Sequence, residues 1–291
     1  MQIEVSEGEG RYRRLVDLSR NNHYNVFDLF EWPDELPSDE LWMSRDLLSV
    51  SGTVYEEELT EDQLLAISKW ESINFYSLSM YGERDLTQVV IKYMHTEEFN
   101  DESEYFHHFV EEENKHMWLF SQFCKRYGGK IYPNKNLKFK GFEQEDINTF
   151  NAFAKIMLFE ELGDYFNRAL KNDKNIHPFI RSLNKQHHID ESRHLAMARI
   201  LLKKKHADLR EKYPDSCIDK IESYLKSYIV SSIELLYNPS VYVDSGIKNP
   251  YEFRRRILAD LATQDKCKKI MGRVVKFFIE SNIFKSEEIY S

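Results

Sequence analysis

Apolar residues recur at helical spacing through the middle of the chain, and interruptions of this pattern separate four long segments. The first opens at Thr60, which forms a capping-box signature with Gln63, and its apolar positions continue to about residue 95. Further periodic segments run from about residue 100 to 126, from about 143 to 172, and from Pro178 to about 205. Proline is favoured in the first turn of a helix. The pattern therefore predicts four long helices arranged as two hairpins.

The segments on either side of these helices read differently. Residues 1–58 show little helical periodicity and include a stretch, 32–38, with two prolines, which is typical of a wrapping arm. Residues 207–291 contain at least two more helices, one over about 217–237 and one that opens at Asn249 and Pro250, with Glu252 three residues after this cap. We therefore predict an all-α fold with a four-helix bundle over residues 59–206. The arm and the C-terminal helices pack on this bundle to form one compact domain.

Charge and composition narrow the classes of partner. The chain has 40 Lys and Arg against 49 Asp and Glu, a formal charge of −9, so we expect neither nucleic acid nor an anionic membrane as a partner. No apolar run reaches the roughly 18 residues that a membrane span needs. The three cysteines are far apart and form no CxxC pair, which suits a reducing compartment, so we expect a cytoplasmic location. Small-molecule chemistry is the better expectation.

Two helices carry glutamate and histidine at a spacing that suits metal binding. The second helix contains Glu113 and His116, which lie three positions apart and therefore about 60° apart around the helix. The fourth repeats this ExxH pattern with Glu191 and His194 and adds His187 one turn earlier, so these three side chains share one face. Dinuclear sites in helical bundles combine two such motifs with one further glutamate from each of the other two helices.

Hairpin geometry indicates which glutamates complete the set. Residues at equal height in a helical hairpin lie equally far in sequence from the turn. Glu83 and Glu113 average to position 98, beside the first turn, and Glu160 and Glu191 average to 175.5, beside the second. The steps from Glu83 to Glu160 (77) and from Glu113 to Glu191 (78) are nearly equal. The two hairpins therefore repeat each other in the layout of their candidate ligands.

Two other glutamates compete for these positions. Glu71 precedes Glu83 by twelve residues, which places it roughly 18 Å along the helix axis and about 120° around it, so we reject it as a ligand. Glu161 is a closer rival to Glu160, since adjacent carboxylates can both approach one site. We favour Glu160 because it lies centrally on the apolar face of its helix, among Phe153, Ile156 and Met157.

The alternative without a metal is that all these residues are solvated surface charges. It fits one ExxH motif but not two motifs with height-matched glutamates among large apolar residues, where uncoordinated carboxylates would be costly. Carboxylates and imidazoles without cysteine suit iron, with manganese as the alternative, and four carboxylates balance two divalent ions. Asp190 and Glu112 precede ligand glutamates and can hydrogen-bond ligand histidines on the facing helix, although a surface charge explains Glu112 nearly as well.

This motif set resembles the ferritin-like dinuclear iron proteins, and within them the p-aminobenzoate N-oxygenase type. That group is identified by the order Glu, ExxH, Glu and HxxxExxH. The corresponding residues in this chain are Glu83, Glu113 with His116, Glu160, and His187 with Glu191 and His194. Flanking segments at residues 47–53 and 238–242 also look similar to the family, so the resemblance covers most of the chain. It implies a ferritin-like bundle with two iron ions.

The resemblance also implies an activity. Members are O2-dependent oxygenases in which a peroxo-diferric species oxidises an aryl amine toward hydroxylamine and nitro products, and His187 would tune that species. The expected partners are a small-molecule amine, O2 and an external electron donor, either a reductase or a ferredoxin-like protein, because the chain has no GxGxxG fingerprint. We also expect a homodimer. The alternatives are a di-iron hydroxylase or other oxidase acting at carbon and, further off, an iron-storage or ferroxidase protein.

Overall fold

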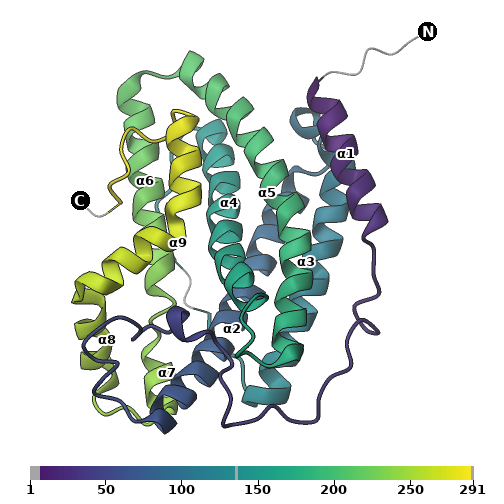
Figure 1. The fold of residues 1–291 in the computed structure, drawn as a ribbon. Helices are drawn as coiled ribbons and strands as arrows, with labels where there is room; N and C mark the ends of the chain where they lie inside the picture. The colour runs from purple at the N-terminus through teal and green to yellow at the C-terminus, as the bar shows by residue number, and fades with distance from the viewer. Residues whose placement is uncertain (1–6, 135–136, 290–291) are drawn as a thin grey trace.

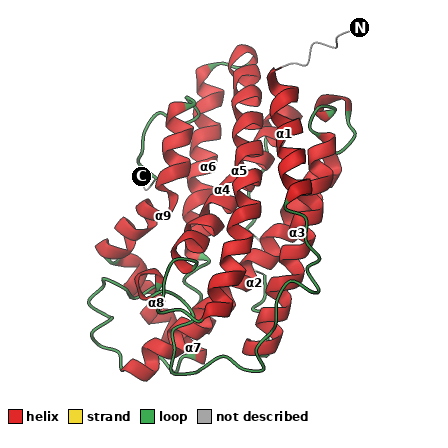
Figure 2. Ribbon diagram, turned by 45° about the vertical axis from the view of Figure 1, so that its right-hand side comes forward, coloured by secondary structure: helices red, strands yellow, loops and turns green. Residues whose placement is uncertain are grey.

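The computed structural model describes residues 7–134 and 137–289, and α-helices form nearly all of its regular structure (Figure 1, Figure 2). Within these residues there is no strand, only one isolated parallel bridge between Leu41 and Ile176. The predicted all-α fold is confirmed. Residues 1–6 of the predicted arm and 290–291 of the predicted C-terminal segment lie outside the described part. The α-helices are α1 (Glu7–Asn21), α2 (Glu61–Tyr93), α3 (Ser103–Phe123), α4 (Glu145–Leu170), α5 (Pro178–Lys212), α6 (Asp215–Glu234), α7 (Pro239–Asp244), α8 (Pro250–Ala259) and α9 (Leu261–Glu280).

The four long helices α2 to α5 form two hairpins, α2 with α3 and α4 with α5, as the apolar pattern predicted. Helix α2 begins with the predicted capping box: the Thr60 hydroxyl accepts from the backbone N–H of Gln63, and the Gln63 side chain accepts from the Thr60 N–H. A short π-helical turn, Cys124–Gly128, prolongs α3. Helix α5 runs on to Lys212, beyond its expected end near residue 205, because the buried His206 and Leu209 continue its inward face.

Helix α1 was not indicated by the sequence pattern. Its buried residues are few, Tyr12, Leu15, Val16 and Ser19, and they lie among charged ones, so its apolar stripe is short. It packs against α3 and α5 (Figure 1). The chain then crosses the end of the bundle to reach α7 and α8 on the other side (Figure 2).

The C-terminal helices cover the opposite side of the bundle, where α6 and α9 pack on α4, and α7 packs on α2. The predicted side-chain cap at Asn249 is wrong, although a helix does begin at Pro250. Asn249 has a left-handed backbone conformation with φ of 52°, and its side chain makes no capping hydrogen bond. None of the helices in the described ranges has both the length and the apolarity needed to span a bilayer.

Aromatic packing holds the helices together next to the polar interior of the bundle. The Tyr76 ring on α2 stacks on Phe120 of α3, with ring centroids 5.1 Å apart, and its hydroxyl accepts a hydrogen bond from Asn184 of α5. Phe120 in turn lies edge-on to His187, with centroids 4.9 Å apart. These contacts tie three helices together and fix the position of a histidine that the sequence analysis selected.

Candidate metal centre

The structure brings all seven predicted ligands into one buried cluster at the centre of the bundle. Each helix contributes its share: one glutamate comes from α2, an ExxH pair from α3, one glutamate from α4 and three residues from α5. Their exposed fractions are between 0 and 3%. They form two adjoining groups, Glu83 with His116, His187 and Glu191, and Glu113 with Glu160, Glu191 and His194, and in each the ligand atoms lie within 4.8 Å of one another.

The first group faces a single point from three helices. His187 Nε2 lies 2.6 Å from Glu191 Oε1 and 3.5 Å from Glu83 Oε1. His116 Nδ1 lies 3.5 Å from the same Glu191 oxygen and 4.0 Å from Glu83 Oε1. Two imidazole nitrogens and two carboxylates therefore converge there.

The second group lies on the other side of Glu191. His194 Nδ1 is 2.7 Å from Glu113 Oε1 and 3.3 Å from Glu191 Oε2, and Glu160 joins them from α4. The two oxygens of Glu191 thus face different groups, Oε1 toward the first and Oε2 toward the second. This arrangement suits a carboxylate shared by two ions.

Apart from their close approaches to one another, the inward-facing atoms of the cluster have no hydrogen-bond partners within the described chain, which fits metal binding. These unsatisfied atoms include both oxygens of Glu83, Glu113 and Glu191, one oxygen of Glu160, Nδ1 of His116 and of His194, and Nε2 of His187. Buried polar atoms nearly always have hydrogen-bond partners. The many unsatisfied atoms that face one place in this interior therefore indicate bound cations. Oxygen and imidazole donors suit iron or manganese.

Charge repulsion supports the same conclusion. Burial, followed by the neighbouring charge of Glu113, holds the pKa of Glu83 well above its usual range. Carboxylates so close together in a dry interior oppose one another's ionisation. Two divalent cations would reverse this effect, because their charge favours the ionised form of every carboxylate in the cluster.

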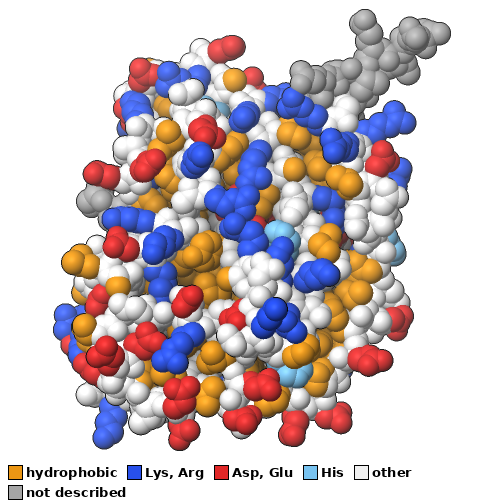
Figure 3. All heavy atoms as spheres, viewed as in Figure 1, with side chains coloured by type: hydrophobic (Ala, Val, Ile, Leu, Met, Phe, Trp, Pro, Cys, Tyr) orange, Lys and Arg blue, Asp and Glu red, His pale blue; other side chains and the backbone are white. Residues whose placement is uncertain are grey.

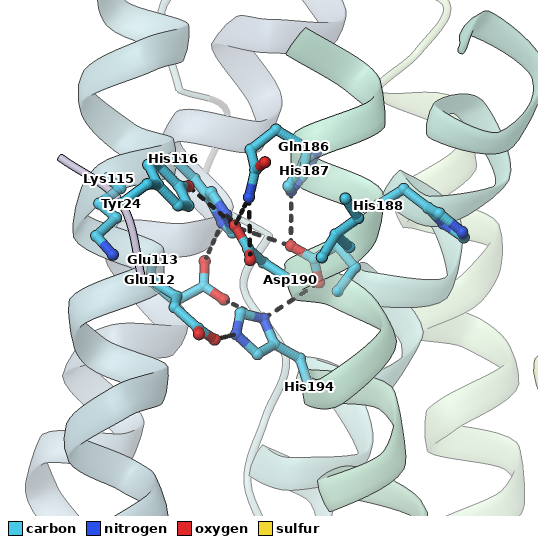
Figure 4. Close-up of polar contacts among 12 residues, drawn as sticks. Tyr24, Glu112, Glu113, Lys115, His116, Gln186, His187, His188, Asp190 and His194 are labelled. Carbon is cyan, nitrogen blue, oxygen red and sulfur yellow. Dashed lines mark hydrogen bonds and ion pairs between the residues drawn. The ribbon is translucent and has the colours of Figure 1, made fainter. Parts of the chain in front are cut away.

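The outward-facing nitrogens of the histidines are held by the residues predicted for that task. His116 Nε2 lies 3.1 Å from Asp190 Oδ2, and His194 Nε2 lies 2.9 Å from Glu112 Oε2 (Figure 4). Glu112 is therefore buried and not a surface charge. Carboxylates in these positions fix the orientation of each ring and present Nδ1 to the cluster.

Arg193 and Asn167 also belong to this outer layer, and the sequence reasoning missed both. Arg193 Nη2 donates to Asp190 Oδ1 and to Glu112 Oε1, at 2.5 Å each, and so links the two carboxylates. Burial alone would raise the pKa of Asp190, but the hydrogen bond with His116 and the charge of Arg193 hold it well below its usual range. The Asn167 side chain lies 2.8 Å from His187 Nδ1. The sequence did contain a signal for Asn167, because this residue lies two turns after Glu160 and therefore on the same face of α4.

The rival residues lie elsewhere. Glu71 accepts hydrogen bonds from the backbone N–H of Ser49, far along α2 from the cluster. Glu161 is buried but forms an ion pair with Arg199. The His188 ring points away from the cluster, as Figure 4 shows, and its Nδ1 atom contacts Asp164. Among the residues that the structure describes, the two groups consist of the seven predicted residues alone.

Comparison with known proteins agrees with this site. The sequence model of the family described as p-aminobenzoate N-oxygenase AurF matches residues 6–282. The chain belongs to this family. No curated protein matches the sequence significantly. Two solved structures with a fold similar to that of this chain are variants of an R2-like ligand-binding oxidase. One, with an aerobically reconstituted Mn/Fe cofactor, has a TM-score of 0.56 at 13% identity and covers 98% of this chain and 96% of its own.

The second, with an anaerobically reconstituted Mn/Fe cofactor, has a TM-score of 0.52 at 14% identity and covers 92% of this chain and 95% of its own. At such identities these likenesses establish the shared ferritin-like fold. Membership of the AurF family, together with the two adjoining ligand groups, makes the chain a di-metal oxygenase or oxidase.

Proposed function

We propose that this protein is an O2-dependent monooxygenase that uses two iron ions to oxygenate the nitrogen of an amine, with manganese as the alternative metal. The observation that carries this proposal is the seven-residue cluster with its third histidine, His187, in a chain of the AurF family. The ions supply the binding and activation of O2. Glu83, His116 and His187 would hold one ion, Glu113, Glu160 and His194 the other, and Glu191 both, in agreement with the predicted ligand set.

The rest of the chain prepares this site for oxidative chemistry. The ligands are buried among apolar side chains, and His194 packs against the Phe109 ring, with centroids 4.4 Å apart. Exclusion of water protects a reactive centre from side reactions. The buried network of Asp190, Glu112 and Arg193 holds His116 and His194 in fixed orientations, so the cluster is ordered before the ions and O2 arrive.

The third histidine distinguishes this proposal from the carbon-oxidising alternative. His187 adds a nitrogen donor to the first group, and Asn167 holds its ring in place. An extra neutral donor changes the electronic properties of an ion without adding charge. We infer that His187 tunes the reaction with O2 toward transfer of oxygen to an amine nitrogen.

Several partners follow from the proposed reaction. Each turnover consumes electrons, and the sequence contains no GxGxxG fingerprint for a flavin or nicotinamide cofactor. We infer that a reductase or ferredoxin-like protein supplies the electrons. A homodimer stays a prediction.

The deciding experiment is incubation of the reduced, iron-loaded protein with ¹⁸O2 and a panel of aryl and alkyl amines, read by mass spectrometry. We expect hydroxylamine or nitro products that carry the label, with turnover that continues only while reductant is supplied. The matched control is the Glu191→Ala variant, which lacks the shared ligand. Oxidation only at carbon across the panel would overturn N-oxygenation and favour the hydroxylase alternative. Iron uptake without any oxidised product would favour storage.

A further inference from the structure

A surface cleft of about 560 Å³ lies between α5, α9 and α1. Its apolar part is formed by Ile200 and Phe277, and Glu280 is the one acidic residue among the described residues that line it. Cations from all three helices surround it: Arg11, Arg199, Lys203, Arg273 and Lys276. Figure 3 shows Lys and Arg side chains gathered in the middle of this face, over the part of the bundle where α5 and α9 lie in Figure 1. We call this site the basic cleft.

Charge is distributed unevenly over the chain, and the basic cleft lies where the positive charge is concentrated. Helix α5 has nine Lys and Arg against four Asp and Glu, and α9 has five against two. These two helices therefore have a net charge of +8 in a chain whose formal charge is −9, which leaves −17 for the rest. A positive field confined to one face of an acidic protein attracts an acidic partner to that face and repels it elsewhere.

The cations at the mouth of the basic cleft are accessible to a partner. Lys203 is exposed, its ammonium group lies 5.7 Å from the ring centroid of Phe277, and no ion pair within the described ranges involves it. Lys276 faces Glu280 at 3.8 Å, and their side chains are 75% and 63% exposed. Such an exposed ion pair contributes little free energy. Carboxylates of a partner can therefore take the place of Glu280 at little cost.

The floor of the basic cleft is connected to the metal centre. Arg199 pairs with the buried Glu161, which directly follows the proposed ligand Glu160 on α4. One turn further along α4, Oδ2 of the buried Asp164 lies 3.7 Å from Nη1 of Arg273. These ion pairs close the floor of the cleft. One ion pair and one peptide bond therefore lead from the cleft to a metal ligand.

This closed floor distinguishes between possible occupants. A substrate, whether free or attached to a carrier, has to enter the metal centre as a whole molecule and needs an open channel. An electron needs no channel, because it can cross packed protein. The seven ligands are only 0–3% exposed, so the cofactor of an electron donor cannot touch them. Electrons must therefore come through the protein from a carrier that docks on its surface.

We propose that the basic cleft is the docking site of an acidic one-electron carrier protein that reduces the metal centre. The inference rests on the proposed function, because only an enzyme that consumes electrons needs a donor. Each docked carrier gives up one electron, so two encounters supply the two electrons that reduce two ferric ions, and no bond forms or breaks in this step. Lys203, Arg273 and Lys276 face carboxylates of the carrier.

The test is anaerobic calorimetric titration of the oxidised, iron-loaded protein with an acidic [2Fe–2S] ferredoxin of the plant type, a one-electron carrier. We expect one ferredoxin to bind per chain at about 20 mM salt, and the affinity to fall about tenfold or more at about 300 mM salt. The reason is that the Debye length shrinks from roughly 20 Å to roughly 6 Å over this range. No binding at low salt, or an affinity independent of salt, would overturn the inference.

Two double variants with the same net charge locate the effect. Lys203→Glu with Lys276→Glu reverses two exposed charges of the cleft and should weaken ferredoxin binding about tenfold or more. The control, Lys185→Glu with Lys248→Glu, reverses two exposed charges outside the cleft and should change the affinity by less than about twofold. Equal losses in the two variants would assign the effect to net charge alone and overturn the docking site. Equal iron content and equal urea midpoints confirm that both variants fold.

Stopped-flow reduction of the iron by reduced ferredoxin gives a second readout. At low ferredoxin concentration the cleft variant should be reduced more slowly, by the same factor as its loss of affinity. At saturating ferredoxin its rate should match the wild type, because Arg199 and Glu161 are unchanged. A maximal rate that falls without any loss of affinity would overturn the inference. So would sedimentation with phosphatidylserine vesicles that depends on Lys203 and Lys276, since it would assign the cleft to a membrane surface.

The docking test can fail independently of the proposed function, because it measures binding without turnover. If ferredoxin docks as expected but no amine in the panel gains oxygen at nitrogen, the N-oxygenase assignment is wrong and the docking site stands. If N-oxygenated products form with a chemical reductant but the cleft variant binds ferredoxin like the wild type, only the docking site is wrong.

Discussion

Replacement of Glu71 by glutamine should stabilise the protein at high pH and leave its stability nearly unchanged at low pH. Glu71 is buried on α2 outside the metal cluster, and its carboxylate accepts from the backbone N–H of Ser49 at 3.0 and 3.2 Å. Lys266 is the nearby cation, and its ammonium group donates to the backbone carbonyl of Leu48. A glutamine has the same shape, and its amide oxygen can accept the same hydrogen bond.

The size of the effect follows from the pKa. Burial raises the pKa of Glu71 from its usual value of 4.5 to about 7, although the Ser49 hydrogen bonds and the charge of Lys266 oppose the shift. The folded state therefore binds this proton more tightly than the unfolded chain does. The free energy of unfolding should fall as the pH rises from about 4.5 to about 7 and then level off. Each pKa unit corresponds to about 1.4 kcal/mol, so the full loss is roughly 3 kcal/mol.

The assay is urea unfolding of the wild type and the Glu71→Gln variant at equal iron loading, between about pH 5 and pH 8. The variant should be more stable by roughly 3 kcal/mol at pH 8, and this advantage should shrink toward zero at pH 5. Glu57→Gln, at an exposed position, is the matched control and should show no such trend. A stability difference of the same size at both ends of the pH range, or a variant that is less stable at pH 8, would refute the reasoning. Loss of iron from the variant would instead make Glu71 a ligand.

Three further substitutions test the metal centre. Glu160→Ala should lower the iron content below two ions per chain. Glu161→Ala removes the ion-pair partner of Arg199 and should leave the iron content unchanged. Equal losses of iron would contradict our choice between the two glutamates. Arg193→Met should destabilise the protein by about 3–5 kcal/mol in urea unfolding, because it leaves two buried carboxylates without their cation. A nearly unchanged stability would show that other groups satisfy these carboxylates. His187→Ala should keep most of the iron, measured by elemental analysis, but change the rate of O2 consumption by the reduced protein; an unchanged rate would make His187 a structural histidine.

The sequence by itself determined the features that repeat with the period of a helix. The spacing of Glu113 and His116, and of His187, Glu191 and His194, places each set on one face of its own helix whatever surrounds it. The symmetry of a helical hairpin about its turn then relates heights on two helices. That relation selected Glu83, and together with the apolar neighbours of Glu160 it favoured Glu160 over Glu161. The structure places both Glu83 and Glu160 in the cluster.

Contacts between helices that are distant in sequence were decided only by the tertiary structure. Arg193 meets Glu112 across 81 positions of the chain, and helical periodicity on α5 says nothing about what α3 offers there. Glu160 and Glu161 differ by only 100° on α4, so the packing of α5, which brings Arg199 to Glu161, separates their roles. A cavity of about 380 Å³, lined by residues of α2, α4 and α6, was likewise decided by packing, because a void is a property of several packed surfaces and no single segment of sequence encodes it.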